Sequence, residues 1–174
     1  PTGKMKSREG TVVDADDLVD EMEKEAAAKT EELGKVKDFS EDELKALYHT
    51  IGLGALKFYL LRVDPKKKMI FNPEESIDFH GFTGPFIQFN HARISSVLRK
   101  NPINNDHTTG NSFLPLEKEL IVLLEKYPSV IKQAGDELNP SAIAIYVYTI
   151  AKTFSSFYTE HSIANAESEA KKQL

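Results

Sequence analysis

The side chains best suited to binding chemistry lie between Asp78 and Lys100, where the sequence reads DFHGFTGPFIQFNHARISSVLRK. Helical spacing places an aromatic, amide and cationic set on or beside one face: Phe86, Phe89, Asn90, Arg93 and Val97. Aromatic rings stack on unpaired bases for about 1–3 kcal/mol each, and arginine binds phosphate, so this face suits RNA. The same spacing is equally typical of Phe86 and Phe89 as core residues. The pattern alone leaves both interpretations open.

A second candidate site is the N-terminal segment PTGKMKSREGTVV, residues 1–13. It combines three cations with small polar residues: Lys4, Lys6, Arg8, Ser7 and Gly10. Cations and loop amides bind anions, so this cluster could hold a phosphate. Considered alone, these residues favour the simpler interpretation, a flexible terminal loop that leads into a short extended segment.

Other chemistries have little support in the sequence. No nucleophile, base and acid are arranged for catalysis, and the paired acids lie in exposed acidic contexts. The 174 residues include no cysteine, and the five histidines lack metal-ligand spacing, so we expect no disulfide and no metal site. No apolar run approaches the roughly 20 residues that span a bilayer, so we expect no membrane partner.

The charge is distributed unevenly along the chain. The net charge is −5, with acidic residues crowded between positions 14 and 43. Between Asp78 and Asp106 there is no other acidic residue, and a run of three lysines occupies positions 66–68. A negative net charge argues against a basic coat over the whole surface but allows a local basic patch. Charge alone favours a binding patch and a solvated face about equally.

Periodicity predicts an all-α protein, a helical bundle with an N-terminal loop and short extended segment. The expected helices occupy residues 14–33, 41–61, 85–100, 115–127, 140–160 and the stretch from 166 onward, with another beginning at Pro128. Ser40 and Glu43 form a capping box, and Thr83 can cap the helix that has Pro85 in its first turn. Residues 69–71 are expected to form a short strand.

The apolar spacing also predicts which side chains are buried. Helix 14–33 has a narrow stripe, so we expect it to lean on the body of the protein. That stripe consists of Leu18, Met22, Ala26 and Leu33. Two further stripes are expected to face the core: Ile87, Ile94 and Leu98; Leu116, Leu120, Ile121, Leu123 and Leu124. Gly52 and Gly54 interrupt a helix at about 1 kcal/mol each, which indicates close backbone packing. Helix 140–160 is so apolar that we expect it at the centre of the bundle.

Two motifs together identify a family resemblance. GKMKSREGTVV resembles the KMSKS loop of class I aminoacyl-tRNA synthetases, in the K-M-S-x-R-x-G form common in arginyl-tRNA synthetases. DFHGFTGPFIQFNHARISSVLRK is similar to that family's G-x-T-G-P-[YF]-[IL]-Q-[YF]-x-H-A-R-[IL] signature. SAIAIYVYTIAKTFSSFY also resembles the helical C-terminal domain of the family. The resemblance covers nearly the whole chain and points to the bacterial type.

The resemblance implies ATP-dependent attachment of arginine to its tRNA through an arginyl-adenylate. It assigns the ATP-phosphate loop to Lys4, Met5 and Ser7, with Lys6 or Arg8 replacing the second lysine of KMSKS. Lys4, Lys6 and Arg8 would stabilise the leaving pyrophosphate. The anticodon-loop contacts implied by the signature are Phe86, Gln88, Phe89, His91 and Arg93, with Arg99 and Lys100 on the RNA backbone. The implied cofactor is ATP with Mg²⁺, and this chain is not expected to hold the Mg²⁺ itself.

The same resemblance implies three regions: residues 1–13 as the end of a catalytic domain, 14–76 as a helical connector, and 77–174 as the anticodon-binding domain. We expect a C-terminal fragment of a cytoplasmic, monomeric enzyme. It should be inactive alone, because the HIGH motif and arginine pocket belong to the catalytic domain. The expected partners are the tRNA for arginine, ATP and L-arginine.

Two other functions fit parts of the sequence. The aromatic face could dock a partner helix in a protein-interaction module with no RNA role. The N-terminal loop could belong to a self-standing nucleotide-binding protein. An apolar face left by absent C-terminal helices could also make the fragment dimerise.

Overall fold

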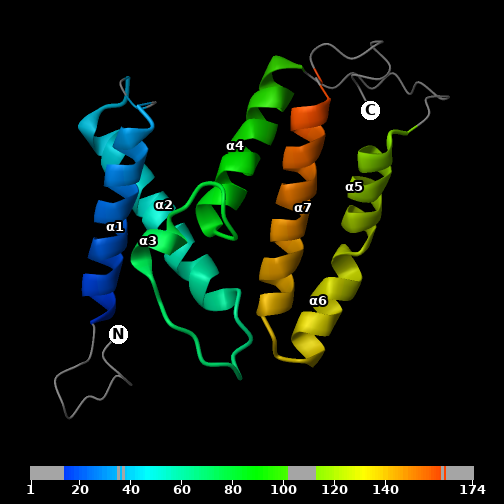
Figure 1. Cartoon of the computed structure of the whole chain (residues 1–174), viewed down its shortest axis with the longest axis horizontal. Helices are drawn as coiled ribbons and strands as arrows, with labels where there is room; N and C mark the ends of the chain where they lie inside the picture. Colours follow the sequence, from blue (N-terminus) through cyan, green and yellow to red (C-terminus); the bar gives the residue numbers. More distant parts are fainter. Residues whose placement is uncertain (1–13, 35, 37, 102–112, 162, 164–174) are drawn as a thin grey trace. The chain divides into compact units, whose positions relative to one another are not determined.

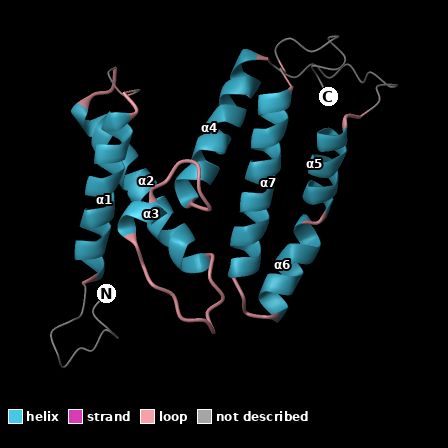
Figure 2. Cartoon of the chain, in the orientation of Figure 1, coloured by secondary structure: helices cyan, strands magenta, loops and turns pink. Residues whose placement is uncertain are grey.

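The computed structural model describes residues 14–34, 36, 38–101, 113–161 and 163, and these residues form helices joined by loops. Seven helices are present among them: α1 (Ala15–Glu32), α2 (Glu41–Leu61), α3 (Pro73–Ser76), α4 (Gly84–Lys100), α5 (Pro115–Glu125), α6 (Tyr127–Asp136) and α7 (Ser141–Glu160) (Figures 1 and 2). The all-α prediction is confirmed. The loop and extended segment expected at residues 1–13, and the helix expected from residue 166, lie outside the described residues.

The strand expected at residues 69–71 is wrong, because this segment is a loop. Ile70 is 80% exposed, and its carbonyl accepts a hydrogen bond from the Tyr59 hydroxyl at 3.0 Å. The Phe71 ring packs edge-on against the Tyr59 ring, with 5.1 Å between the ring centroids. A β-prone run needs a partner strand to satisfy its backbone, and the described part of the chain offers none.

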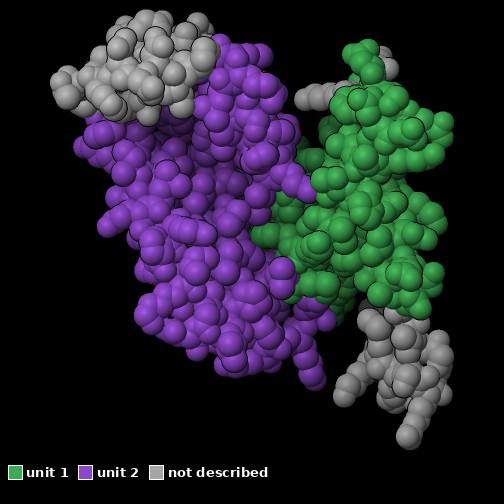
Figure 3. Space-filling view, turned by 180° about the vertical axis from the view of Figure 1, so that it is seen from behind, with its two compact units in different colours: residues 1–60, 70–85 green, residues 61–69, 86–174 purple. Residues whose placement is uncertain are grey.

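The chain divides into two compact units (Figure 3). Unit 1 comprises residues 1–60 and 70–85, and unit 2 comprises residues 61–69 and 86–174. Helix α4 begins in unit 1 with Gly84 and Pro85 and continues in unit 2 from Phe86. The regions expected from the sequence, with a boundary between residues 76 and 77, stay a prediction.

Unit 1 is built around the helix that was expected to lie at its edge. Met22 and Ala26 of α1 are 0% exposed, and they pack with α2 residues and Ile77 in one hydrophobic cluster. Leu33 was expected to extend this stripe, but it caps the helix and is 44% exposed, while Thr30 is buried in its place. Helix α1 is therefore a core element of unit 1.

The capping box at the start of α2 is confirmed. The Glu43 carboxylate accepts hydrogen bonds from the Ser40 amide and hydroxyl, each at 2.8 Å, and the Glu43 amide donates to the Ser40 hydroxyl oxygen at 3.3 Å. These donors favour the ionised carboxylate and so lower the pKa of Glu43. The backbone amides of Ser40 and Glu43, which have no partner within the helix, thus each donate a hydrogen bond to the side chain of the other residue.

Two glycines permit close backbone contacts in unit 1. A Cβ atom on Gly52 would lie 2.8 Å from the Met22 carbonyl oxygen, so only a glycine lets α2 approach α1 this closely. A Cβ atom on Gly84 would lie 2.5 Å from the Gly54 carbonyl oxygen. The sequence prediction of close packing around Gly52 is confirmed, and the first residue of α4 is fixed by the same kind of contact.

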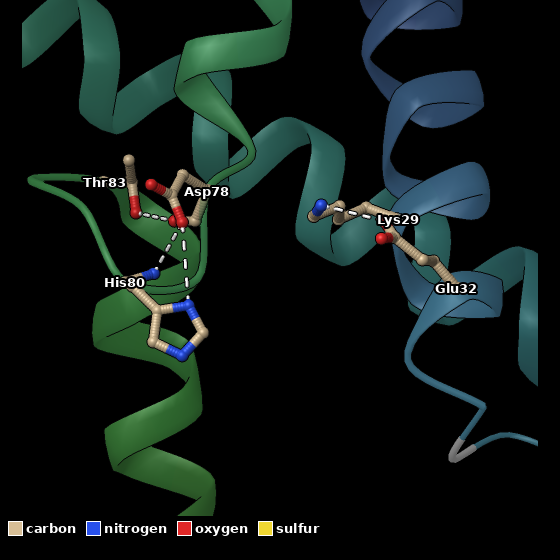
Figure 4. Close-up of polar contacts among 5 residues, drawn as sticks. All are labelled: Lys29, Glu32, Asp78, His80 and Thr83. Carbon is tan, nitrogen blue, oxygen red and sulfur yellow. Dashed lines mark hydrogen bonds and ion pairs between the residues drawn. The ribbon is translucent and has the colours of Figure 1, made fainter.

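The turn before α4 is held by side chains around Asp78 (Figure 4). The Thr83 hydroxyl donates to the Asp78 carbonyl oxygen, and the His80 amide donates to the Asp78 carboxylate at 2.8 Å. Thr83, Gly84 and Pro85 are buried. The start of α4 is consequently fixed by local hydrogen bonds as well as by packing.

In unit 2, α5 and α6 pack against α7. The Tyr146 hydroxyl of α7 donates to the Leu123 carbonyl oxygen at 2.8 Å, and the Thr153 hydroxyl donates to the Glu119 carboxylate at 3.4 Å. The apolar stripes of this unit are less buried than predicted, as four exposed fractions show: Leu98 49%, Ile121 48%, Leu124 60% and Ile145 48%. Periodicity predicted the helices of this unit correctly, but it overestimated how many of their apolar side chains are buried.

We predict that Gly52→Ala destabilises the protein although alanine favours helix. The added methyl would contact a backbone carbonyl that cannot move alone, and such overpacking costs about 1–3 kcal/mol. The matched control is Gly135→Ala in α6, where an added Cβ meets nothing within 4 Å. Urea unfolding followed by circular dichroism should show a lower midpoint for Gly52→Ala only. Equal midpoints for the two variants would contradict the close contact.

Candidate nucleic-acid interface

Helix α4 presents the predicted RNA-binding residues at different degrees of exposure. His91, Arg99 and Lys100 are exposed, Phe89 is 39% exposed, and Phe86, Gln88 and Arg93 are half-buried. The helix has no acidic residue in its first turn, and Arg99 and Lys100 occupy its last turn. Cations at a helix C-terminus interact favourably with the helix dipole, so this end stably presents positive charge.

The most distinctive feature of this surface is a stack of three side chains from α4 and α7. The guanidinium carbon of Arg93 lies 4.5 Å from the centroid of the Phe89 ring and 4.6 Å from the centroid of the Tyr158 ring. The Arg93 Nη1 group also donates to the Ser155 hydroxyl at 3.4 Å. We call Phe89, Arg93 and Tyr158 the aromatic–guanidinium stack.

Phe86 and Asn90 lie in more closed surroundings than Phe89. The Phe86 ring packs against Tyr148 of α7, with 5.4 Å between ring centroids. Asn90 is only 1% exposed, and its amide donates to the Phe86 carbonyl oxygen at 2.9 Å. Asn90 therefore does not belong to the exposed face on which helical spacing placed it. Of the two phenylalanines, Phe86 is mainly a packing residue, and Phe89 has free ring surface.

The stack leaves specific groups accessible for binding. Phe89 and Tyr158 are each 39% exposed, so ring surface is available to a stacking partner. The Arg93 guanidinium lies over both rings, and its N–H groups are donors that suit phosphate or carbonyl oxygens. The arrangement combines a stacking platform with a charged donor, which is the combination that binds single-stranded nucleic acid.

Sequence reasoning missed Tyr158 and Ser155 as parts of this surface. Both lie in the segment SAIAIYVYTIAKTFSSFY, which was interpreted only as bundle core. A signal was present, because Tyr148, Ser155 and Tyr158 recur at helical spacing, and all three carry a hydroxyl group. In the structure all three contact α4. Tyrosine at such positions offers an apolar ring with a polar end.

The predicted phosphate-binding residues Lys4, Met5, Lys6, Ser7 and Arg8 lie outside the described residues. The described part of unit 1 has a pocket of about 560 Å³ whose lining includes Lys29, Glu32, Glu74 and Asp78. Lys29 pairs with Glu32 at 2.8 Å (Figure 4), and this hydrogen bond raises the pKa of Lys29. An acidic lining repels phosphates, so this pocket does not support a nucleotide site.

Within the described ranges, no group of three or more histidine and carboxylate side chains could hold a metal ion. No helix there has the length and apolar character needed to cross a membrane.

Two family models match the chain. The DALR anticodon binding domain matches residues 87–174, and the catalytic domain of tRNA synthetases class I (R) matches residues 2–72. The first match begins within α4, and the second includes α1 and α2.

Individual relatives agree with these matches. The chain is 55% identical to the arginine–tRNA ligase of Flavobacterium psychrophilum over 99% of its own length, and 50% identical to that of Amoebophilus asiaticus over 100%. The solved arginyl-tRNA synthetase of Thermus thermophilus matches 98% of the chain with a TM-score of 0.80 at 26% identity, and the chain covers 29% of that structure. The chain spans 29% and 30% of the two relatives' lengths. The resemblance stated from the two motifs is confirmed.

We predict that Arg93→Lys weakens the junction of α4 and α7, whereas Arg99→Lys does not. Lysine keeps the charge but loses the planar group that contacts both rings and Ser155. The loss should be about 0.5–1 kcal/mol, as for other cation–π contacts at partly exposed sites. Thermal unfolding followed by circular dichroism measures the difference. Arg99 is exposed on the same helix, so an equal effect of both changes would contradict a structural role for the stack.

Proposed function

This chain belongs to the DALR anticodon binding domain family, and we propose that it supplies anticodon-loop binding to an arginine–tRNA ligase. The observation that carries the proposal is the aromatic–guanidinium stack, in which Arg93 contacts two rings that are each 39% exposed, within the segment matched by the anticodon-binding model. An anticodon loop consists of unpaired nucleotides, whose bases can leave the stack and lie against such rings.

The proposed contacts differ in what they contribute. Phe89 and Tyr158 stack on unpaired bases, and the guanidinium edge of Arg93 donates to a base or phosphate oxygen. Gln88 and His91 are the candidates for hydrogen bonds to base edges. Arg99 and Lys100 bind the phosphate backbone and so add affinity without reading the sequence. Phe86 contacts Tyr148 of α7 and so helps to hold α4 and α7 together.

The remaining steps of the reaction concern the proposed ligase as a whole. It would join arginine to its tRNA using ATP, with an arginyl-adenylate as intermediate and with Mg²⁺ accompanying the nucleotide. Lys4, Met5 and Ser7 are proposed to contact the ATP phosphates, and Lys6 or Arg8 to supply the second cation. We propose a monomeric cytoplasmic enzyme, of which residues 1–174 alone would not catalyse the reaction.

The competing function, a helical protein-interaction module without an RNA role, has less support. An apolar docking face would not need a guanidinium at its centre, because burying that charge against a partner helix is costly unless it is paired. The same arginine is well suited to a polyanion, for which its in-plane donors have partners.

We predict that Phe89→Ala weakens binding of the anticodon loop. The unmodified chain should bind an arginine tRNA more tightly than the same tRNA with altered anticodon bases. Removal of the Phe89 ring takes away the stacking of one base and should weaken cognate binding about 10-fold. The control is Phe39→Ala, which removes a phenylalanine that is 45% exposed in unit 1. Filter binding or fluorescence anisotropy gives both affinities. Equal and feeble binding of the unmodified chain to both tRNAs would contradict the proposed function.

We also predict separate effects for the two ends of the chain in the complete ligase. Lys4→Ala should slow arginyl-adenylate formation about 100-fold, since it removes a cation from the developing pyrophosphate charge, and should leave tRNA affinity unchanged. Arg93→Ala should raise the KM for tRNA and leave ATP–pyrophosphate exchange intact. Comparing Lys6→Ala with Arg8→Ala in the exchange assay identifies the second cation. If either Lys4→Ala or Arg93→Ala impaired both adenylate formation and tRNA binding, the assigned roles would be contradicted.

A further inference from the structure

A basic turn in unit 2 has no part in the proposed contacts. It occupies the loop after α2, within residues 61–69, and carries Lys66, Lys67 and Lys68 consecutively. All three lysines are exposed. Figure 1 shows this loop at the lower end of the unit, at the same end as the connection between α6 and α7.

The backbone of the turn is fixed by Asp64 and Pro65. The Asp64 carbonyl oxygen accepts a hydrogen bond from the Lys67 amide at 2.8 Å, which closes a four-residue turn. The Asp64 carboxylate accepts from the Lys66 amide at 2.8 Å, and proline fixes φ at the second position of the turn. The lysine side chains therefore project from a preorganised backbone, which reduces the entropy lost when a ligand is bound.

The three ammonium groups have no ion-pair partner among the described residues. Two other exposed lysines do have one, since Lys45 pairs with Glu41 at 3.2 Å and Lys132 pairs with Asp136 at 2.5 Å. The one carboxylate in residues 61–69, that of Asp64, is occupied by the backbone of the turn. A local excess of positive charge thus faces solvent on a protein whose net charge is −5.

The chemistry of the turn points to phosphate and not to bases. It has neither an aromatic ring for stacking nor an amide side chain for reading base edges. Ammonium groups on flexible stems act as point charges that bind phosphate without sequence information. The C-terminal end of α4, with Arg99 and Lys100, lies at the opposite, upper end of the unit in Figure 1. Helix α4 alone is about 25 Å long, so the two basic groups would meet different phosphates.

We propose that Lys66, Lys67 and Lys68 form a second RNA-backbone site, which binds phosphodiesters of the same tRNA away from the anticodon bases. The inference rests on the proposed function and adds to it a contact that strengthens binding without selecting the anticodon. Each neutralised phosphate releases counterions, so each lysine contributes to the salt dependence of binding.

The test compares two triple variants of the chain that change the net charge equally. Lys66→Gln/Lys67→Gln/Lys68→Gln removes the turn charges, and Lys118→Gln/Lys126→Gln/Lys132→Gln removes three exposed charges from α5, α6 and their junction in the same unit. Affinity for arginine tRNA is measured at salt concentrations from about 50 to about 300 mM, a range over which screening of charges increases strongly. Each measurement is made with the cognate and with the altered anticodon. Circular dichroism confirms that each variant is folded.

The logarithm of the association constant falls as the logarithm of the salt concentration rises. In the turn variant this slope should be shallower by about 2–3, since each phosphate contributes about 0.7 in single strands and about 0.9 in duplexes. The turn variant should weaken binding by the same factor for both anticodons, and the control variant should leave the slope nearly unchanged. Single Lys→Gln variants should each lower the slope by slightly less than 1.

An unchanged slope in the turn variant, or equal slopes in both triple variants, would overturn the inference. Anticodon discrimination by the unmodified chain tests the proposed function separately, so the two can fail independently. Binding of the unmodified chain to phosphatidylserine vesicles, lost in the turn variant while its tRNA slope is unchanged, would also overturn the inference and assign the turn to a lipid surface.

Discussion

The candidate interface depends on the contacts that the Arg93 guanidinium makes with two aromatic rings. Phe89 and Arg93 lie one turn apart on α4, and Tyr158 comes from α7, so the stack exists only when these two helices pair. An aliphatic residue at position 93 could also contact the two rings. It could not also donate to Ser155 and present further N–H groups at its edge. One side chain therefore both joins the helices and supplies the charge that the proposed RNA contact requires.

The register of α4 decides which of its residues remain available. Phe86 packs on Tyr148, and Asn90 is buried with its amide on the Phe86 carbonyl oxygen, so one side of the helix is used for packing. The start of the helix is set in unit 1, where Gly84 contacts the backbone at Gly54 and Thr83 binds the Asp78 carbonyl oxygen. Anchoring by residues 83–86 and 90 thus leaves Phe89 and Arg93 at the surface.

The parts of the fold that depend on local interactions could be predicted from the sequence. The Ser40–Glu43 capping box and the glycine contact at position 52 follow from residues that are close in the chain or from a residue type with a single explanation. Burial was predicted less well, because it depends on which other helix packs against each apolar side chain. Ile121 and Leu98 have helical spacing, yet both are about half exposed. Tyr158 was missed for the same reason, since its role depends on a residue 65 positions earlier in the chain.

Affinity and selectivity for RNA would reside on different residues of this protein. Counterion release depends on the number of phosphates neutralised and is insensitive to sequence, so lysines on turns and at helix ends suit it. Discrimination needs rings and donors in fixed positions, which only the helix-borne stack provides. The acidic residues crowd the first turns of α1 and α2 in unit 1, whereas α4 has none and the turn after α2 uses its single carboxylate internally. Because charges are screened over about 8–10 Å, the local excess on unit 2 and not the net charge of −5 would govern the encounter with a polyanion.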